Sequence, residues 1–124
     1  MPFDHERLDV YQVALEFFDL ADEVVENLPR GRGHLADQLA RTSLSIVAEG
    51  AGKFSKGDKR RYYLAAAGSS TECAAMLDVC LRRKLITEQA HRSGKQLLDR
   101  IVAMLVKLAT SLQQPGSGTG TGSG

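Results

Sequence analysis

The chain of 124 residues has the length of one domain, and 43% of its residues are hydrophobic, which is enough aliphatic material for one core. Its 16 Lys and Arg residues nearly balance its 15 Asp and Glu residues, leaving a net charge of +1. This balance excludes a generally polybasic nucleic-acid coat and an acidic disordered chain. Any charge that serves binding must therefore be concentrated locally.

The segment before Pro29 is predicted to form an amphipathic helix. Its apolar side chains recur at intervals of three and four residues, and Leu8 and Leu15 widen the stripe. The predicted core positions are Tyr11, Ala14, Phe18, Ala21, Val25 and Leu28. Residues 3–28 also contain eight acids and one base, Arg7, so this helix is predicted to be an acidic rod. The acids are Asp4, Glu6, Asp9, Glu16, Asp19, Asp22, Glu23 and Glu26.

Two more helices are predicted in the middle of the chain. One spans about residues 34–48 and stops at Gly50-Ala51-Gly52. The next begins at Ser55, which forms a capping-box pattern with Asp58, and continues to about Leu85. The expected inward residues of the first are Leu35, Leu39, Ser43, Ile46 and Val47. Those of the second are Tyr62, Ser69, Cys73, Met76 and Cys80.

Thr87 is the predicted N-cap of a fourth helix, whose apolar residues again recur at intervals of three and four. They are Leu98, Ile101, Leu105, Leu108 and Leu112. Residues 113–124 are rich in Gly, Ser and Thr, which predicts a disordered tail. Four helices with short connections predict an all-α, antiparallel up-down-up-down four-helix bundle over residues 1–112.

The two cysteines, Cys73 and Cys80, lie seven residues apart, which is too far for a disulfide within one helix. They are predicted to be buried thiols of a reducing compartment. The N-terminus has no signal-peptide pattern, and no apolar run reaches the roughly 18 to 20 residues that span a bilayer. These features predict a cytoplasmic protein that does not bind membranes.

Positive charge is concentrated in residues 30–61, which contain eight bases and three acids. Five of these bases lie just before or within the start of the third predicted helix, beside Tyr62 and Tyr63, and are predicted to contact nucleic-acid phosphates. They are Lys53, Lys56, Lys59, Arg60 and Arg61. In the alternative interpretation these bases are solvated, or they pair with acids within the bundle or between copies. At least one of the two tyrosines is expected in the core.

A second basic cluster, Arg82-Arg83-Lys84, ends the third predicted helix. Cations are stabilised there by the negative end of the helix dipole, which is a sufficient explanation for them.

The sequence contains no catalytic or metal-binding motif that predicts an enzyme. His5, His34 and His91 are scattered over the N-terminal arm and two helix starts, and neither a GxSxG elbow nor a phosphate-binding GxxxxGK[ST] loop occurs. No cofactor is predicted. Glu49 is interpreted as a structural carboxylate that bonds to the start of a neighbouring helix.

Four segments of the chain together suggest a family: residues 3–12, 37–41, 48–53 and 67–72. They resemble segments of the four-helix bundle proteins encoded within 23S rRNA intervening sequences, and the similarity covers essentially residues 3–112. This resemblance implies a left-handed bundle that assembles as a ring-shaped homopentamer without enzymatic activity or a small-molecule substrate. The family is similar to the accessory protein of diversity-generating retroelements, which binds nucleic acid and a reverse transcriptase.

The chain departs from the family pattern at the end of the second helix. At this position the relatives have the sequence Asn-Ile-Ala-Glu-Gly after a longer apolar stretch. In this chain Ser45-Ile46-Val47 precedes Ala48-Glu49-Gly50. Either Ile46 replaces the Asn or about three residues are missing, which would rotate the later residues of the helix by about 60° from their register. We therefore expect a distortion in this helix or in the loop after it.

The sequence supports two functional hypotheses. The first is a non-enzymatic, self-associating bundle that binds structured RNA or another nucleic acid through the basic segment, because opposite charges provide the two complementary surfaces of a ring. The second is a protein-interaction adaptor whose acidic first helix, through Asp19, Asp22 and Glu26, binds a basic partner such as a polymerase.

Overall fold

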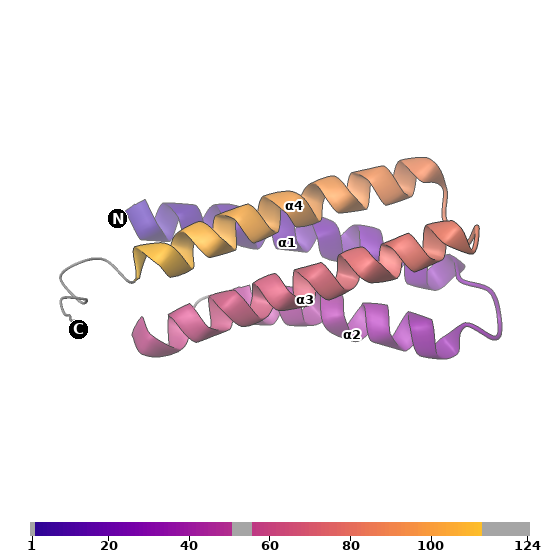
Figure 1. Cartoon of the computed structure of the whole chain (residues 1–124), viewed down its shortest axis with the longest axis horizontal. Coiled ribbons are helices and arrows are strands. Elements are labelled where there is room, and N and C mark those ends of the chain that lie inside the picture. The colour runs from indigo at the N-terminus through magenta and orange to yellow at the C-terminus, as the bar shows by residue number, and fades with distance from the viewer. Residues whose placement is uncertain (1, 51–55, 113–124) are drawn as a thin grey trace.

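A computed structural model describes residues 2–50 and 56–112 of the chain. They form four helices, α1 (Pro2–Asn27), α2 (Gly33–Gly50), α3 (Lys56–Arg82) and α4 (Glu88–Ser111), and this described part contains no strand (Figure 1). Each helix packs against the next, and α4 packs against α1. The predicted antiparallel up-down-up-down bundle is confirmed. The predicted tail at 113–124 and the predicted N-cap Ser55 lie outside the described residues.

The core is one stripe along each helix, and in α1 that stripe is displaced from the predicted one. The buried residues are Val10, Val13, Ala14, Phe17, Ala21 and Val24. Tyr11, Phe18 and Val25 are only half-buried, and Leu8 is 56% exposed, so the predicted stripe was partly wrong. Because α1 is apolar over a wide arc, its apolar residues alone do not determine which side faces the core. The acidic residues do, since they keep one side of the helix in solvent. The observed stripe lies opposite the acidic side, and Leu8 lies on that side.

The same displacement occurs in α3, whereas most predicted core residues of α2 and α4 are buried and only Leu35, Val47 and Leu112 are half-buried. Tyr62, Ser69 and Met76 are half-buried, and the fully buried residues of α3 are Tyr63, Ala66, Ser70, Cys73, Leu77 and Cys80. Both cysteines are free, as predicted. In α2 and α4 the deepest residues are Leu39, Ser43, Ile46, Leu98, Ile101, Leu105 and Leu108.

α3 ends three residues earlier than the sequence predicted, at Arg82 rather than Leu85. Lys84 has a positive φ of 59°, and its N–H donates to Leu81 O, while the N–H of Leu85 donates to Cys80 O. These two hydrogen bonds form a Schellman motif, with Lys84 in the position that glycine usually takes. The reversal of the chain at Lys84 therefore stops the helix although apolar residues continue.

The start of α4 agrees with the prediction. Thr87 has an extended backbone, and its hydroxyl accepts a hydrogen bond from Ala90 N at 3.0 Å. This contact satisfies one of the N–H groups that have no acceptor inside a helix.

α2 is shorter than α3 and pairs with its C-terminal half. Glu49, at the end of α2, contacts Ser69, which is 13 residues into α3. Because the two helices are antiparallel and rise equally per residue, Ala36 at the start of α2 lies beside Arg82 at the end of α3. α2 itself is continuous to Gly50, so the expected distortion is absent from the described part of this helix.

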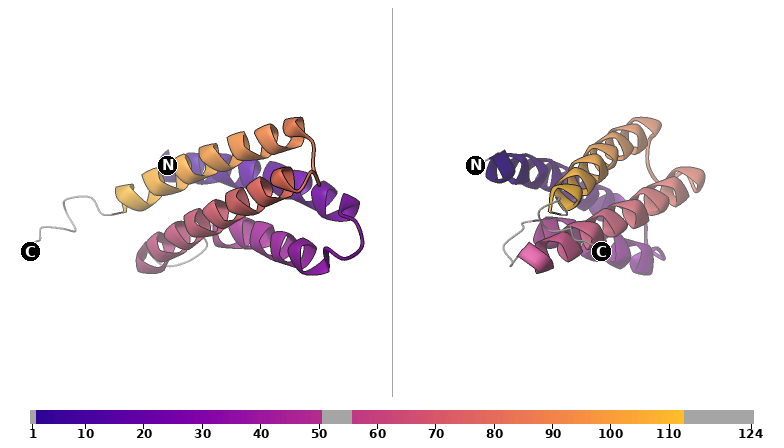
Figure 2. Two further views of the ribbon diagram at one scale, coloured as in Figure 1. Left: turned by 45° about the vertical axis from the view of Figure 1, so that its right-hand side comes forward. Right: turned by 60° about the vertical axis from the view of Figure 1, so that its left-hand side comes forward.

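α3 is also apolar and long enough to qualify, by length and composition alone, as a membrane-crossing helix over Asp58–Arg82. This finding corrects the prediction that no segment approaches that length. In the bundle 28% of its most apolar 18-residue window is buried, and core side chains such as Cys73 and Leu77 come from this helix. Its alanines account for much of the apolar character, and the helix packs as one of the four members (Figure 2).

The first and last helices are joined near the chain ends. Lys107 Nζ on α4 lies 2.9 Å from Glu6 Oε2 on α1, so the start of α1 and the end of α4 lie at the same end of the bundle. The other end holds the α1–α2 and α3–α4 turns (Figure 1).

Candidate nucleic-acid interface

The structure does not bring the predicted basic residues to one face of α3. Successive residues of a helix are rotated by about 100°, so Lys59 and Arg61 point in nearly opposite directions. Accordingly, Arg61 is exposed, whereas Lys59 and Arg60 are half-buried. Lys56 opens α3, but its side chain lies outside the described ones, and Lys53 lies outside the described residues altogether.

Arg61 is the most accessible of the three cations whose side chains the structure describes, with 71% of its side chain exposed. Its Nη2 lies 3.2 Å from Asp58 Oδ1, and its guanidinium sits 5.3 Å from the centroid of the Tyr62 ring. An exposed ion pair of this kind contributes little to stability. A base that stacked here would meet the guanidinium plane first, because Arg61 covers one face of Tyr62.

Arg60 differs from Arg61 because part of its guanidinium is enclosed. Its Nε is buried and has no hydrogen-bond partner among the described residues. A buried donor without an acceptor is costly, so a substitution of Arg60 would affect the stability of the fold as well as its charge.

Tyr63 is buried and Tyr62 half-buried, which confirms that at least one of the pair belongs to the core.

Glu49 has a different partner from the one predicted. Its Oε1 accepts a long hydrogen bond of 3.5 Å from Ser69 Oγ, in the middle of α3 rather than at a helix start. The prediction failed because α3 extends past the end of α2, which places Glu49 beside the α3 midpoint. Burial raises the pKa of Glu49, the Ser69 hydrogen bond opposes this, and nearby Glu72 adds to the increase.

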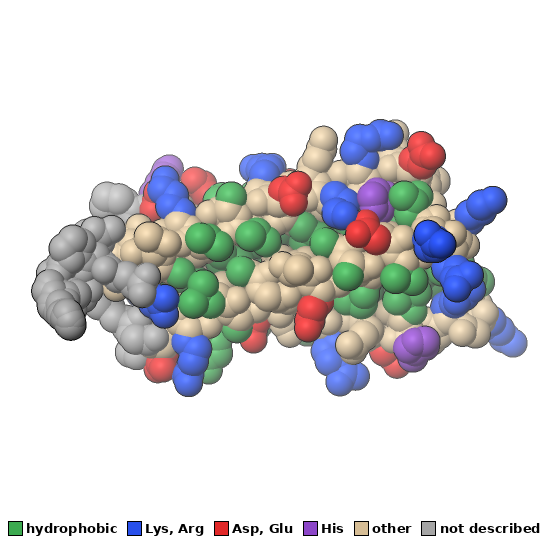
Figure 3. Space-filling view, in the orientation of Figure 1, with side chains coloured by type: hydrophobic (Ala, Val, Ile, Leu, Met, Phe, Trp, Pro, Cys, Tyr) green, Lys and Arg blue, Asp and Glu red, His purple; other side chains and the backbone are tan. Residues whose placement is uncertain are grey.

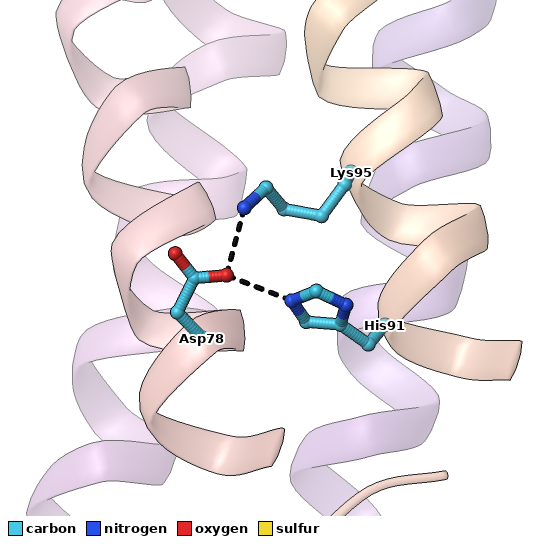
Figure 4. Close-up of polar contacts among 3 residues, drawn as sticks. All are labelled: Asp78, His91 and Lys95. Carbon is cyan, nitrogen blue, oxygen red and sulfur yellow. Dashed lines mark hydrogen bonds and ion pairs between the residues drawn. The ribbon is translucent and has the colours of Figure 1, made fainter. Parts of the chain in front are cut away.

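A polar cluster that sequence reasoning missed joins α3 to α4. Asp78 Oδ1 lies 2.7 Å from both His91 Nε2 and Lys95 Nζ (Figure 4). His91 and Lys95 are one turn apart and therefore face α3 together. The only available signal was this spacing, and it does not reveal which acid on another helix would be opposite.

The residues around His91 do not form a metal centre. Contrary to the interpretation that the sequence has no metal-binding motif, Glu88 and His91 have the Glu-x-x-His spacing that ligates metals in some bundle proteins. However, the described residues contain no group of three or more His, Cys, Asp or Glu side chains that could hold an ion. His91 instead has Asp78 as its partner.

The acidic character of α1 is on its outer face, as predicted. Its exposed acids are Asp9, Glu16, Asp19, Asp22, Glu23 and Glu26. Glu6, which pairs with Lys107, is the exception among the described acids of this helix.

Comparison with protein families gives the context of this bundle. The family model described as 23S rRNA-intervening sequence protein matches residues 6–107, which include parts of all four helices. The chain belongs to this family. Membership in the family confirms the resemblance noted from the four segments, and it agrees with the observed all-α four-helix fold. Comparison with curated proteins gave no match.

Proposed function

We propose that this protein is a non-enzymatic, homo-oligomeric four-helix bundle that binds structured RNA or another nucleic acid through the basic start of α3. The phosphate-contacting residues are Lys53, Lys56, Lys59, Arg60 and Arg61. The observation that carries the proposal is Arg61, an exposed guanidinium lying on an aromatic ring beside further cations. This combination can contact a phosphate and stack against a base.

Oligomerisation is proposed on charge complementarity. The outer face of α1 is acidic, whereas the start of α3 is basic, and these different surfaces allow one copy to contact the next head to tail. A closed ring results if the rotation between copies is uniform, and the resemblance to the family suggests five of them. Multi-angle light scattering at micromolar concentration tests this, and a monomer would refute the oligomeric part.

Nucleic-acid binding is tested by fluorescence anisotropy of a labelled RNA hairpin, with a DNA duplex of equal length for comparison. The native protein should bind with an affinity that falls steeply as salt increases, because each phosphate contact releases counterions. The variant Lys56→Gln/Lys59→Gln/Arg61→Gln should lose most of that salt dependence. It spares Arg60, whose partly buried side chain supports the fold.

An adaptor function is the second candidate, favoured by the exposed acids of α1. Here Asp19, Asp22 and Glu26 bind a basic protein such as a polymerase. Substitution of these three by Asn, Asn and Gln would then abolish partner capture, while the α3 variant would leave it unchanged.

A further inference from the structure

The turn end of the bundle carries five exposed cations that the sequence places in two separate groups. Arg30 and Arg32 lie in the α1–α2 turn, Arg82 is the last residue of α3, and Arg83 and Lys84 lie in the α3–α4 turn. We call these five residues the turn-end cluster. In the space-filling view, Lys and Arg side chains gather at the right-hand end of the molecule, where these turns lie (Figure 3).

The helix register places the two groups side by side. The Glu49–Ser69 contact sets the alignment of α2 with α3, which brings the first turn of α2 beside Arg82. Arg32 is near enough to Cys80, in the last turn of α3, to lower the pKa of that thiol against the larger effect of burial, which raises it. Arg32 therefore lies beside the last turn of α3, which Arg83 and Lys84 directly follow.

Within the described residues no ion pair involves this cluster. None of its five side chains takes part in a hydrogen bond or ion pair there, and α2 has no acid in its first turn. Glu23 lines the same surface hollow as Lys84 without pairing with it. The helix dipole explains only part of the cluster. It favours Arg82 and Arg83 at the C-terminus of α3, but it disfavours Arg30 and Arg32 beside the N-terminus of α2.

The residues at two positions of this surface are not the ones that the fold alone would favour. Lys84 occupies a left-handed conformation at φ 59°, where glycine or asparagine would be less strained, yet it supplies a cation. Gly33 opens α2, and a Cβ at this position would have no atom within 4 Å. Its lack of a side chain leaves the backbone between Arg32 and α3 open to close approach.

We propose that the turn-end cluster is a phosphate-binding surface for nucleic acid, separate from the start of α3. Four of its five cations are arginines, whose planar guanidinium groups bind phosphate oxygens in pairs. The first N–H groups of α2 lack intrahelical acceptors and add donors between them. A bound anion also removes the repulsion among like charges.

This surface extends the proposed function and rests on it in part. α3 has 27 residues, so the two basic regions lie at ends of a helix about 40 Å long. A DNA duplex needs about 12 base pairs to span that length at 3.4 Å per pair, and an A-form RNA duplex needs more because its rise per pair is smaller. The ligand of highest affinity is therefore expected to be a duplex or hairpin longer than this, which contacts both ends.

The test compares three variants of the full chain that each lose three positive charges. The turn-end variant is Arg32→Gln/Arg82→Gln/Arg83→Gln, and the α3-start variant is Lys56→Gln/Lys59→Gln/Arg61→Gln. A charge-matched control, Arg41→Gln/Arg100→Gln/Lys107→Gln, changes exposed cations elsewhere. Each is titrated into a labelled RNA hairpin of about 20 base pairs over a range of salt, and circular dichroism and light scattering check fold and assembly.

The turn-end variant should bind at least tenfold more weakly than the charge-matched control at low salt. The slope of log affinity against log salt should fall by about three, one for each lost contact. Binding equal to that of the control overturns the inference, and so does a change in oligomeric state with unchanged RNA affinity, because the cluster would then contact an acidic helix. Native protein that fails to bind RNA at low salt overturns both proposals. If only the turn-end variant loses RNA affinity, the turn-end cluster is supported and the proposed binding site at the start of α3 is refuted.

Discussion

Asp78 Oδ1 on α3 accepts a hydrogen bond from Lys95 Nζ on α4 at 2.7 Å, and the same oxygen contacts His91. This carboxylate is the centre of the polar link between the last two helices. It lies near the surface, since 56% of its side chain is exposed, so its effect on stability is small and depends on pH.

Replacing Asp78 by Asn should destabilise the protein at neutral pH but not in acid. The hydrogen bonds from Lys95 and His91 hold the pKa of Asp78 below its ordinary value. A carboxyl group with a lower pKa in the folded state stabilises the fold above its unfolded pKa of about 3.9, and that stability disappears as pH falls through the folded pKa. In urea unfolding at pH 7, the free energy of unfolding of the variant should be lower than that of the native protein by less than about 1 kcal/mol, and this difference should disappear near pH 2. Asp19→Asn, at an exposed acid of α1, should show no such pH-dependent gap.

Lys84→Gly should stabilise the bundle. A lysine at φ 59° is strained because its Cβ approaches the backbone, and glycine removes this strain. Glycine also increases the entropy of the unfolded chain, which opposes the gain. The free energy of unfolding should therefore rise by about 0.5 to 1 kcal/mol. Thermal unfolding measures the change. Lys84→Ala is the matched control, because alanine removes the charge but retains the Cβ. If alanine stabilises as much as glycine, charge repulsion rather than backbone strain is responsible.

Two glycine-to-alanine substitutions should have opposite effects. A Cβ at Gly94 would lie 2.6 Å from Leu77 Cδ1 and 3.4 Å from Leu20 Cδ2, so Gly94→Ala should destabilise by about 1 to 2 kcal/mol despite its higher helix propensity. At Gly68, on the exposed side of α3, a Cβ meets nothing within 4 Å, so Gly68→Ala should stabilise by up to about 1 kcal/mol.

Chemical denaturation compares the two, and Leu77→Val in the Gly94→Ala background should recover part of the loss. A stabilising Gly94→Ala would show that α3 and α4 are not as close in solution.

The thiols should be unreactive until the protein unfolds. Burial, with a smaller effect of Glu72, raises the pKa of Cys73 to about 12, and burial also raises the pKa of Cys80. The thiolate is the reactive form, so a disulfide reagent at pH 8 should modify both cysteines quickly only in denaturant. Rapid modification of the native protein would indicate that the α3 core opens.

Sequence periodicity predicted the helices well because each has a polar side and an apolar side. It did not predict how a helix is rotated about its own axis where that helix is apolar over a wide arc. In α1, Phe17 and Phe18 are equally apolar, and only the position of the acids identifies Phe17 as the core residue. The end of α3 was missed for a different reason, because a lysine rather than a glycine adopts the left-handed conformation at residue 84.

The polar sites depend on register between helices, which no local pattern contains. The sequence shows that His91 and Lys95 share a face, but the choice of Asp78 as partner depends on how far α3 slides along α4. Likewise, Arg32 and Cys80 are 48 residues apart, and they lie close together because α2 runs antiparallel to the C-terminal half of α3.

The Glu6–Lys107 ion pair indicates that the chain could be circularly permuted. Since the start of α1 and the end of α4 lie together, a short linker between them would join helices that already touch. New termini opened at Gly31, in the exposed α1–α2 turn, would leave every helix–helix interface in place. The bundle is in this sense circular, and a permuted chain that begins with α2 and ends with α1 is expected to fold to the same structure.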